Sequence, residues 1–236
     1  MPSTTFHVGA TLIDMDGTLV DSTAGIEGAW EVFKKSYPDI DVKKILRSSH
    51  GVRTIDNLRI YCGITDPEKL EKEAERFDAA IVTSAADGGA GIVSLPGVKA
   101  AMDELSPARK LPKPLWAICT SATRVYALSA LDLAGVLLPD VLVVAEDVTQ
   151  GKPCPHPYLL AAKKCGVKPE NCVVLEDTPA GIRSGQAAGC KTIGLLTTHT
   201  RAQMEACNPD FLVKDMASVT LKLTDNGVDV TVHTED

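Results

Sequence analysis

The sequence has few aromatic residues, a deficit of positive charge and no long apolar segment. Its 236 residues include four Phe, four Tyr and two Trp, and 24 Lys and Arg stand against 31 Asp and Glu, a net charge of −7. Such a surface does not attract nucleic acid or an anionic membrane. No run approaches the ~18 apolar residues that a membrane-spanning helix requires. We therefore expect no nucleic-acid partner and no membrane partner.

Cysteine pairs at CxxC spacing are also absent, although the chain has seven cysteines. Without clustered Cys and His ligands, a zinc site is not expected. Several cysteines, such as Cys119 and Cys172, lie inside apolar runs, which is typical of buried, reduced thiols in a cytoplasmic protein. The opening residues MPSTTFHVGA lack both the basic and the apolar segment of a secretion signal. We therefore expect a cytoplasmic location.

The sequence does contain an alternation of strand and helix patterns. Six short apolar runs are typical of buried strands, at residues 8–13, 115–120, 141–145, 172–175, 192–196 and 211–213. Helical patterns at 122–133, 157–165 and 180–188 follow the second, third and fourth runs. This alternation predicts an α/β protein with a doubly wound, Rossmann-like parallel sheet covered by helices on both faces.

A helical segment separates the first two predicted strands, which lie about a hundred residues apart, far more than one crossover needs. Apolar residues three or four apart predict two helices, one with Ile26, Trp30, Phe33 and Tyr37 and one with Leu70, Ala74, Phe77 and Ile81. Thr65 and Glu68 form a capping-box pattern at the start of the second helix. We predict a small helical domain at 23–91, ending in a glycine-rich hinge at 87–91, and a core domain formed by 1–22 and 92–236.

The C-terminal segment has a different pattern. Alternating apolar residues flank Asp225-Asn-Gly227, which predicts a β-hairpin around Asn-Gly. No long apolar surface stripe remains unassigned, so we expect a monomer.

Two carboxylates, Asp14 and Asp16, follow the first predicted strand in the motif Asp14-x-Asp16-Gly-Thr18. Ligands bind beyond the carboxyl ends of the strands in open α/β sheets. Two close carboxylates repel each other, so a site that keeps both ionised requires a hard cation. A metal-bound carboxylate can also act as a nucleophile toward phosphorus. An Asp-rich turn explains the same motif when it is taken alone.

Polar residues also follow three further predicted strands. Ser121 and the backbone N–H of Ala122 suit a phosphate oxygen, although Ser121 alone could be an N-cap. Lys152, in a Gly-Lys-Pro loop, suits a phosphoryl group, although a single Lys is commonly a solvated surface residue. Glu176 and Asp177 end an apolar strand, where they need a cation or N–H donors, or where Asp177 is an N-cap. In a parallel sheet these strand ends share one edge, so we expect one site.

The ordered set Asp14-x-Asp16-Gly-Thr18, Ser121, Lys152 and Glu176-Asp177 resembles the four motifs of haloacid-dehalogenase (HAD) hydrolases, over essentially the whole chain. A closer resemblance to the fungal glycerol-1-phosphatase and 2-deoxyglucose-6-phosphatase group is carried by Ser49-His50-Gly51-Val-Arg53-Thr54, Gln150-Gly151-Lys152-Pro153 and Glu176-Asp177-x-Pro-Ala-Gly-Ile182. The resemblance implies a HAD core with an inserted helical cap. It also implies a Mg²⁺-dependent phosphatase that hydrolyses a small phosphomonoester.

The resemblance further implies a role for each motif residue. Asp14 would be the nucleophile that forms an aspartyl-phosphate, and Asp16 would be the general acid and base. Mg²⁺ would be held by the side chains of Asp14 and Asp177 and the backbone carbonyl of Asp16, with Glu176 nearby. The phosphoryl oxygens would be bound by Ser121, Lys152 and the backbone N–H groups near Met15 and Ala122.

In the cap, the resemblance suggests that His50 and Arg53 contact the substrate, although Arg53 could simply begin the helix that carries Ile55 and Leu58. Two rival functions share the scaffold. A sugar phosphomutase would retain every core residue and return the phosphoryl group to a sugar. A catalytically inactive binding protein would be free to lose Asp14, Asp16 or Lys152, all of which are present.

Overall fold

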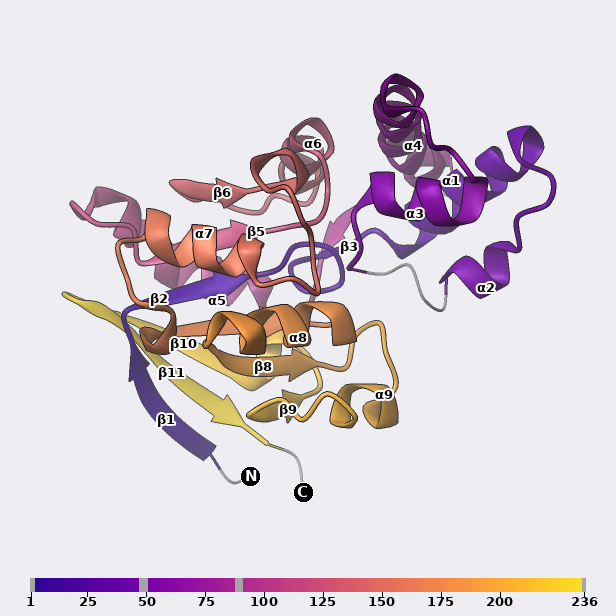
Figure 1. The fold of residues 1–236 in the computed structure, drawn as a ribbon. Coiled ribbons are helices and arrows are strands. Elements are labelled where there is room, and N and C mark those ends of the chain that lie inside the picture. Colours follow the sequence, from indigo (N-terminus) through magenta and orange to yellow (C-terminus); the bar gives the residue numbers. More distant parts are fainter. Residues whose placement is uncertain (1–2, 47–50, 88–90, 235–236) are drawn as a thin grey trace.

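A six-stranded parallel sheet forms the centre of the computed structural model, which describes residues 3–46, 51–87 and 91–234. Figure 1 shows this sheet beneath its covering helices. Its strand order is β6-β5-β2-β7-β8-β9, with β2 and β7 at the centre. The strands are β2 (Ala10–Ile13), β5 (Trp116–Cys119), β6 (Val141–Val143), β7 (Cys172–Glu176), β8 (Lys191–Leu195) and β9 (Phe211–Val213). The predicted parallel α/β sheet is therefore confirmed.

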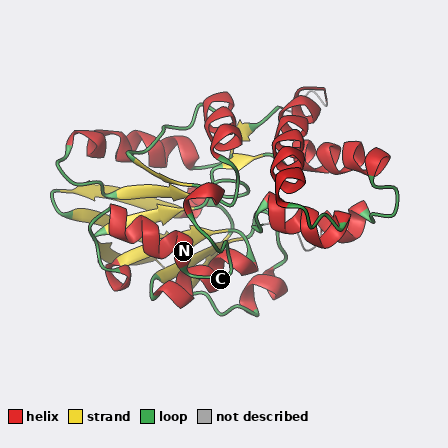
Figure 2. Ribbon diagram, turned by 45° about the horizontal axis from the view of Figure 1, so that its top comes forward, coloured by secondary structure: helices red, strands yellow, loops and turns green. Residues whose placement is uncertain are grey.

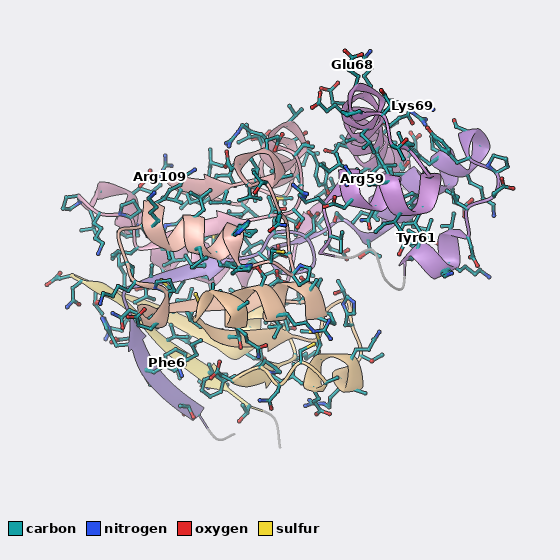
Figure 3. All side chains as sticks on the ribbon, in the orientation of Figure 1. Phe6, Arg59, Tyr61, Glu68, Lys69 and Arg109 are labelled. Atoms are coloured by element: carbon teal, nitrogen blue, oxygen red, sulfur yellow. The ribbon has the colours of Figure 1, made fainter. Side chains whose placement is uncertain are left out.

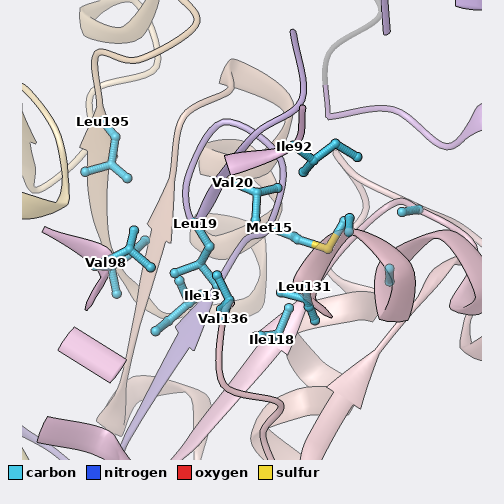
Figure 4. Packing of buried hydrophobic residues seen from close by; sticks show 14 of the residues in the cluster. Ile13, Met15, Leu19, Val20, Ile92, Val98, Ile118, Leu131, Val136 and Leu195 are labelled. Carbon is cyan, nitrogen blue, oxygen red and sulfur yellow. The ribbon is translucent and has the colours of Figure 1, made fainter. Parts of the chain in front are cut away.

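Helices cover both faces of the sheet, which is why its strands are continuously apolar. On one face, Leu12 and Val174 pack against Tyr158 of α7, and α8 lies beside α7. On the other face, Ile13 and Ile118 belong to the larger core, which Figure 4 shows together with residues of α5 and α6. The covering helices are α5 (Val98–Leu105), α6 (Arg124–Leu133), α7 (His156–Lys164), α8 (Pro179–Ala188) and the short α9 (Arg201–Glu205).

The prediction of one strand at residues 8–13 is wrong. The chain leaves one sheet at Val8 and enters another at Ala10: β1 (Ser3–Val8) pairs with β11, whereas β2 pairs with β5 and β7. Gly9 lies between them and donates its backbone N–H to Asn171 O (2.7 Å). An apolar run does not show which partner strands will pair with each part of it, so the sequence pattern merged the two strands.

The predicted C-terminal hairpin is present as β10 (Val219–Thr224) and β11 (Gly227–His233). Thr224 pairs with Gly227, so the two turn residues are Asp225 and Asn226, one position before the predicted Asn-Gly pair. With β1 the hairpin forms a three-stranded antiparallel sheet. Phe6 of this sheet, labelled in Figure 3, stacks on Phe211 of the edge strand β9. Their ring centroids are 5.5 Å apart.

Four helices lie together beside the sheet, as Figures 1 and 2 show. They are α1 (Thr23–Ser36), α2 (Val42–Leu46), α3 (Thr54–Cys62) and α4 (Pro67–Asp87). The rings of Trp30 and Phe77 join α1 to α4, with centroids 4.6 Å apart. Figure 3 shows Glu68 and Lys69 on the side of α4 that points away from the sheet. These helices correspond to the predicted helical segment, and we refer to them below as the helical group.

A pair of short strands connects the helical group to the rest of the chain. In this pair β3 (Val20–Asp21) is antiparallel to β4 (Val93–Ser94). Most of the predicted hinge at 87–91 lies outside the described residues. At the start of α4, Asp66 Oδ1 accepts a hydrogen bond from the N–H of Lys69 (2.8 Å), so Asp66 caps the helix rather than the predicted Thr65. In the part of the chain that the structure describes, no helix is long and apolar enough to cross a membrane.

Candidate active site

The candidate site lies at the carboxyl edge of three neighbouring strands of the sheet, β5, β2 and β7. Ile13 of β2 is in register with Ile118 of β5 and with Leu175 of β7. Asp14 therefore follows β2 directly beside the end of β7, where Glu176 and Asp177 lie. Neighbouring parallel strands bring residues far apart in sequence to one edge, as the sequence predicted for these carboxylates.

Lys152 is the buried cation of this edge. Its ammonium donates hydrogen bonds to Asp14, to Glu176 and to the backbone carbonyl of Cys119, the last at 3.1 Å. The Lys152 side chain is fully buried, so it is not the solvated surface residue of the alternative interpretation. Burial opposes the charge of Lys152, but the carboxylates of Asp14 and Glu176 outweigh this effect and raise its pKa. Lys152 therefore stays protonated beside Asp14.

Glu176 is held from several sides in a fully buried position. Tyr158 donates its hydroxyl to Oε1 (2.8 Å), and Thr178 donates both its N–H (3.1 Å) and its hydroxyl (3.0 Å) to Oε2. The carboxylate also approaches α8 so closely that a Cβ on Gly181 would lie 1.8 Å from it. This geometry directs Glu176 toward Lys152 and makes it a positioning residue for that ammonium.

Asp177 is buried beside the same carboxylates. Thr18 donates its hydroxyl to Oδ1 (3.1 Å), and Thr198 donates to Oδ2. Burial and the charge of Glu176 raise the pKa of Asp177 to about 7. Asp177 is not the N-cap of α8, because Thr178 accepts the capping hydrogen bond from the N–H of Gly181.

The three carboxylates suit a hard divalent cation. One oxygen from each of Asp14, Glu176 and Asp177 lies within 4.8 Å of the others. Burial and Glu176 raise the pKa of Asp14 well above its usual range even though Lys152 opposes the shift. Three carboxylates facing one ammonium leave an excess of buried negative charge, which an oxygen-ligated cation would neutralise. The cluster can therefore bind a metal ion.

Asp16 has different partners from the other acids. Ser22 donates its hydroxyl to Oδ1 at 2.6 Å, and Tyr126 of α6 donates to the same oxygen at 2.9 Å. Burial raises the pKa of Asp16, although both hydrogen bonds oppose the shift. A carboxyl group with a raised pKa is suited to giving and taking a proton. Sequence reasoning missed Ser22 and Tyr126, because neither belongs to a recognisable motif.

The two predicted phosphate-binding positions after β5 have partners in this structure. Ser121 donates its hydroxyl to the carbonyl of Gly51 (2.8 Å), which connects the core to the helical group. The N–H of Ala122 donates to Thr120 Oγ1 (3.0 Å). Ser121 is not the N-cap of α6, since Thr123 accepts the capping bond from Tyr126 N. Both Ser121 and Ala122 line the same cavity as Asp14 and Asp16.

Of the two predicted cap residues, the structure describes Arg53, whereas His50 lies outside the described residues. Arg53 donates from Nε to Asp56 (2.8 Å) and from a terminal nitrogen to the carbonyl of Val148 (3.1 Å). Its side chain also lies over Gly151, where a Cβ would be 2.8 Å from Arg53 Cγ. Arg53 thus connects the helical group to the loop that carries Lys152, and it is not among the residues that line the cavity.

A cavity of about 80 Å³ lies between this edge and the helical group. We call it the chamber. Its wall combines Asp14, Asp16, Thr120, Ser121, Ala122 and Tyr126 from the core with Ile26, Trp30, Gly51, Val52, Thr54, Asn57, Phe77, Asp78 and Ile81 from the helical group.

The fold and this site together define an α/β protein with a buried carboxylate cluster that can bind a metal ion at the carboxyl edge of its sheet. Comparison with known proteins identifies the family. The model of the haloacid dehalogenase-like hydrolases matches residues 8–189. Glycerol-1-phosphate phosphohydrolase 1 of Saccharomyces cerevisiae is 34% identical over 93% of this chain and 88% of its own. Hexitol phosphatase A of Escherichia coli is 34% identical over 92% of this chain and 95% of its own.

A solved structure shows the same fold. The β-phosphoglucomutase of Clostridium difficile superposes with a TM-score of 0.73 over 89% of this chain and 92% of its own, at 19% identity. The chain belongs to the haloacid dehalogenase-like hydrolase family, as the sequence motifs predicted.

Proposed function

We propose that this protein is a cytoplasmic, Mg²⁺-dependent phosphatase that hydrolyses a small polyol or sugar phosphomonoester through an aspartyl-phosphate. The observation that carries the proposal is Asp14, held by Lys152 at the carboxyl edge of the sheet within a cluster of three buried carboxylates. The relatives named as glycerol-phosphate and hexitol phosphatases support the substrate class. The seven free cysteines support a reducing compartment.

In the first step, an Asp14 carboxylate oxygen attacks phosphorus and the bond from phosphorus to the leaving oxygen breaks. Asp16 gives its proton to that oxygen, so the alcohol leaves uncharged. Tyr126 and Ser22 orient the Asp16 carboxyl group for this transfer. In the second step, water attacks phosphorus, Asp16 takes a proton from the water, and Asp14 is released with inorganic phosphate.

The other residues bind and neutralise the phosphoryl group. Lys152 keeps its positive charge at Asp14, and Ser121 and the N–H of Ala122 bind phosphoryl oxygens once they exchange their present partners. Asp14, Asp177 and the backbone carbonyl of Asp16 would hold Mg²⁺, with Glu176 nearby, and the bound ion would neutralise the phosphoryl charge.

We also propose that residues 23–91 form a cap domain over a core formed by 1–22 and 92–236, and that the protein is a monomer. The hydrogen bond between Ser121 and Gly51 and that between Arg53 and Val148 support a cap that closes on the core. Closure would exclude bulk water from the chamber. Substrate contacts by Arg53 and His50 stay predictions.

Phosphate release tests the proposal. The panel contains glycerol 1-phosphate, hexitol and sugar phosphates, 2-deoxyglucose 6-phosphate and β-glucose 1-phosphate, each with Mg²⁺ and with EDTA. We expect Mg²⁺-dependent release from a narrow group of these esters, and no release by Asp14→Asn. Conversion of β-glucose 1-phosphate to glucose 6-phosphate without release would establish a mutase instead. If no ester releases phosphate or is converted, the result would favour a catalytically inactive binding protein.

A further inference from the structure

The chamber has a carboxylate, Asp78, on the side formed by the helical group. Asp78 belongs to α4, is 5% exposed and lines the chamber together with Asp16. Thr123, at the start of α6 in the core, donates its hydroxyl to Asp78 Oδ2, and Thr54 of α3 donates to Oδ1 at 3.4 Å. Asp78 is therefore a polar group of the helical group at its contact with the core, in the wall of the chamber that faces the acids of the core.

The chamber contains no compensating positive charge among the described residues of its wall, although three of them are aspartates. Three basic side chains of the surrounding segments already have partners, since Arg124 binds Asp147 and the other two are Lys152 and Arg53. Lys152 binds Asp14 and Glu176, and Arg53 binds Asp56 and the carbonyl of Val148. Burial raises the pKa of Asp78 to about 7, and the charges of Asp16 and, to a lesser extent, Glu146 contribute to the shift.

The carboxylate of Asp78 can accept further hydrogen bonds. A carboxylate offers about four acceptor positions, and two threonine hydroxyls occupy two of them, one through a long contact. Its neighbours Trp30 and Phe77 form an apolar wall with ring centroids 4.6 Å apart. A hydroxyl group that enters beside this wall finds the acceptor it needs in Asp78, because a buried hydroxyl without a partner is unfavourable.

Resting on the phosphatase function proposed above, we propose that Asp78 is a specificity-determining residue of the chamber. Its carboxylate accepts a hydrogen bond from a hydroxyl of an uncharged leaving group, and it repels a leaving group that carries a carboxylate or a second phosphate. The protein therefore selects monophosphates of neutral polyhydroxy compounds.

The test compares two substrates that differ in one charge. Glycerol 1-phosphate and 3-phosphoglycerate both have three carbons and one phosphate ester, but the second has a carboxylate where the first has a hydroxymethyl group. We would measure kcat/KM for both at pH 8, where Asp78 is ionised, and take their ratio. The variants are Asp78→Asn, which removes the charge, Asp78→Glu, which retains it, and Glu75→Gln, which removes a charge from the exposed side of the same helix.

For Asp78→Asn we expect the ratio of glycerol 1-phosphate to 3-phosphoglycerate to fall by roughly tenfold to a hundredfold. Asp78→Glu and Glu75→Gln should keep the ratio within about threefold of the wild-type value. A purely structural role of Asp78 in cap closure would lower kcat/KM for both substrates together and leave the ratio unchanged, which would overturn the proposal.

The failures of the two proposals are distinguishable. If the wild-type protein hydrolyses glycerol 1-phosphate and Asp78→Asn leaves the ratio unchanged, the assignment of Asp78 fails and the phosphatase function stands. If the wild-type protein releases phosphate from no ester of the larger panel, both proposals fail. If Asp78→Asn does not fold, Asp78→Ser removes the same charge from a smaller side chain, and an unchanged ratio in that variant contradicts the assignment.

Discussion

Replacement of Lys152 by methionine tests the electrostatics of the site most directly. The side chain is fully buried and its ammonium binds Asp14, Glu176 and the carbonyl of Cys119. Methionine preserves most of the aliphatic chain but leaves two buried carboxylates without their cation. Removing one partner of a buried ion pair costs about 3–5 kcal/mol. For a chain of this length, that loss lowers Tm by roughly 6–20 °C.

The assay is thermal and urea unfolding at pH 8 in EDTA. The matched control is Lys168→Met, because the Lys168 side chain is 80% exposed and lies 3.9 Å from Glu170. An exposed pair of this kind contributes about 0–1 kcal/mol. Addition of Mg²⁺ should stabilise Lys152→Met more than the wild-type protein, since the acidic cluster has lost a competing cation. A ligand at a hundred times its Kd contributes about 2.7 kcal/mol.

The pH dependence of this variant has a definite sign. Burial and Glu176 already raise the pKa of Asp14 in the folded protein, and loss of Lys152 removes an opposing effect. The folded variant therefore binds a proton more readily than the unfolded chain, so part of its lost stability returns as the pH falls. A loss below about 1 kcal/mol in EDTA at pH 8, equal to that of Lys168→Met, would refute the reasoning.

Three further predictions concern neighbouring groups. Thr198→Val removes a hydroxyl donor to Asp177 and should weaken Mg²⁺ affinity by roughly 10- to 100-fold. Calorimetric titration measures this, and unchanged affinity would contradict a role of Thr198 in orienting Asp177 as a ligand. Gly181→Ala places a Cβ 1.8 Å from the Glu176 carboxylate and should destabilise the fold by more than about 2 kcal/mol, with Ala180→Gly as the neighbouring control in urea unfolding. Folding raises the pKa of Asp78 from 3.8 to about 7, so the folded protein holds this proton more tightly than the unfolded chain. The resulting gain in the free energy of unfolding is complete below pH 3.8 and is lost as the pH rises through 7. The Tm of Asp78→Asn minus that of the wild type should therefore be more positive at pH 8 than at pH 5, and equal differences would contradict a buried, titrating Asp78.

The sequence predicted the parallel sheet and the residues at its carboxyl edge for a simple reason. Strands buried on both faces are continuously apolar, and a polar residue that follows such a strand stands out. Asp14 and the pair Glu176 and Asp177 follow this pattern, Lys152 lies in the loop after β6, and the structure brings them together. Each belongs to a local motif that can be read without knowing the packing.

Other parts of the site depend on contacts between distant segments. Tyr126 reaches Asp16 from a helix, and Thr198 reaches Asp177 from the loop after β8. No local pattern marks either residue. The sequence does mark Asp78 as unusual, because it is a charged residue at helical spacing from apolar ones. It lies four residues after Ala74 and three before Ile81, on the apolar side of α4. A charged residue on such a face indicates either a buried partner or a site.

Local pattern alone determined the α/β class, the C-terminal hairpin and the principal acids of the candidate site, because hydrophobic periodicity and motif spacing are properties of short segments. The family followed from the resemblance of the four ordered motifs and from the comparison with known proteins. Tertiary structure decided that the apolar run at residues 8–13 is divided at Gly9 into two strands. It also decided which groups Arg53 binds and that Asp78 lies in the wall of the chamber. Each of these depends on which surfaces meet across the fold, such as Arg53 with Val148 and Asp78 with Thr123. These contacts depend on how whole helices and strands pack, which no single segment of the chain specifies.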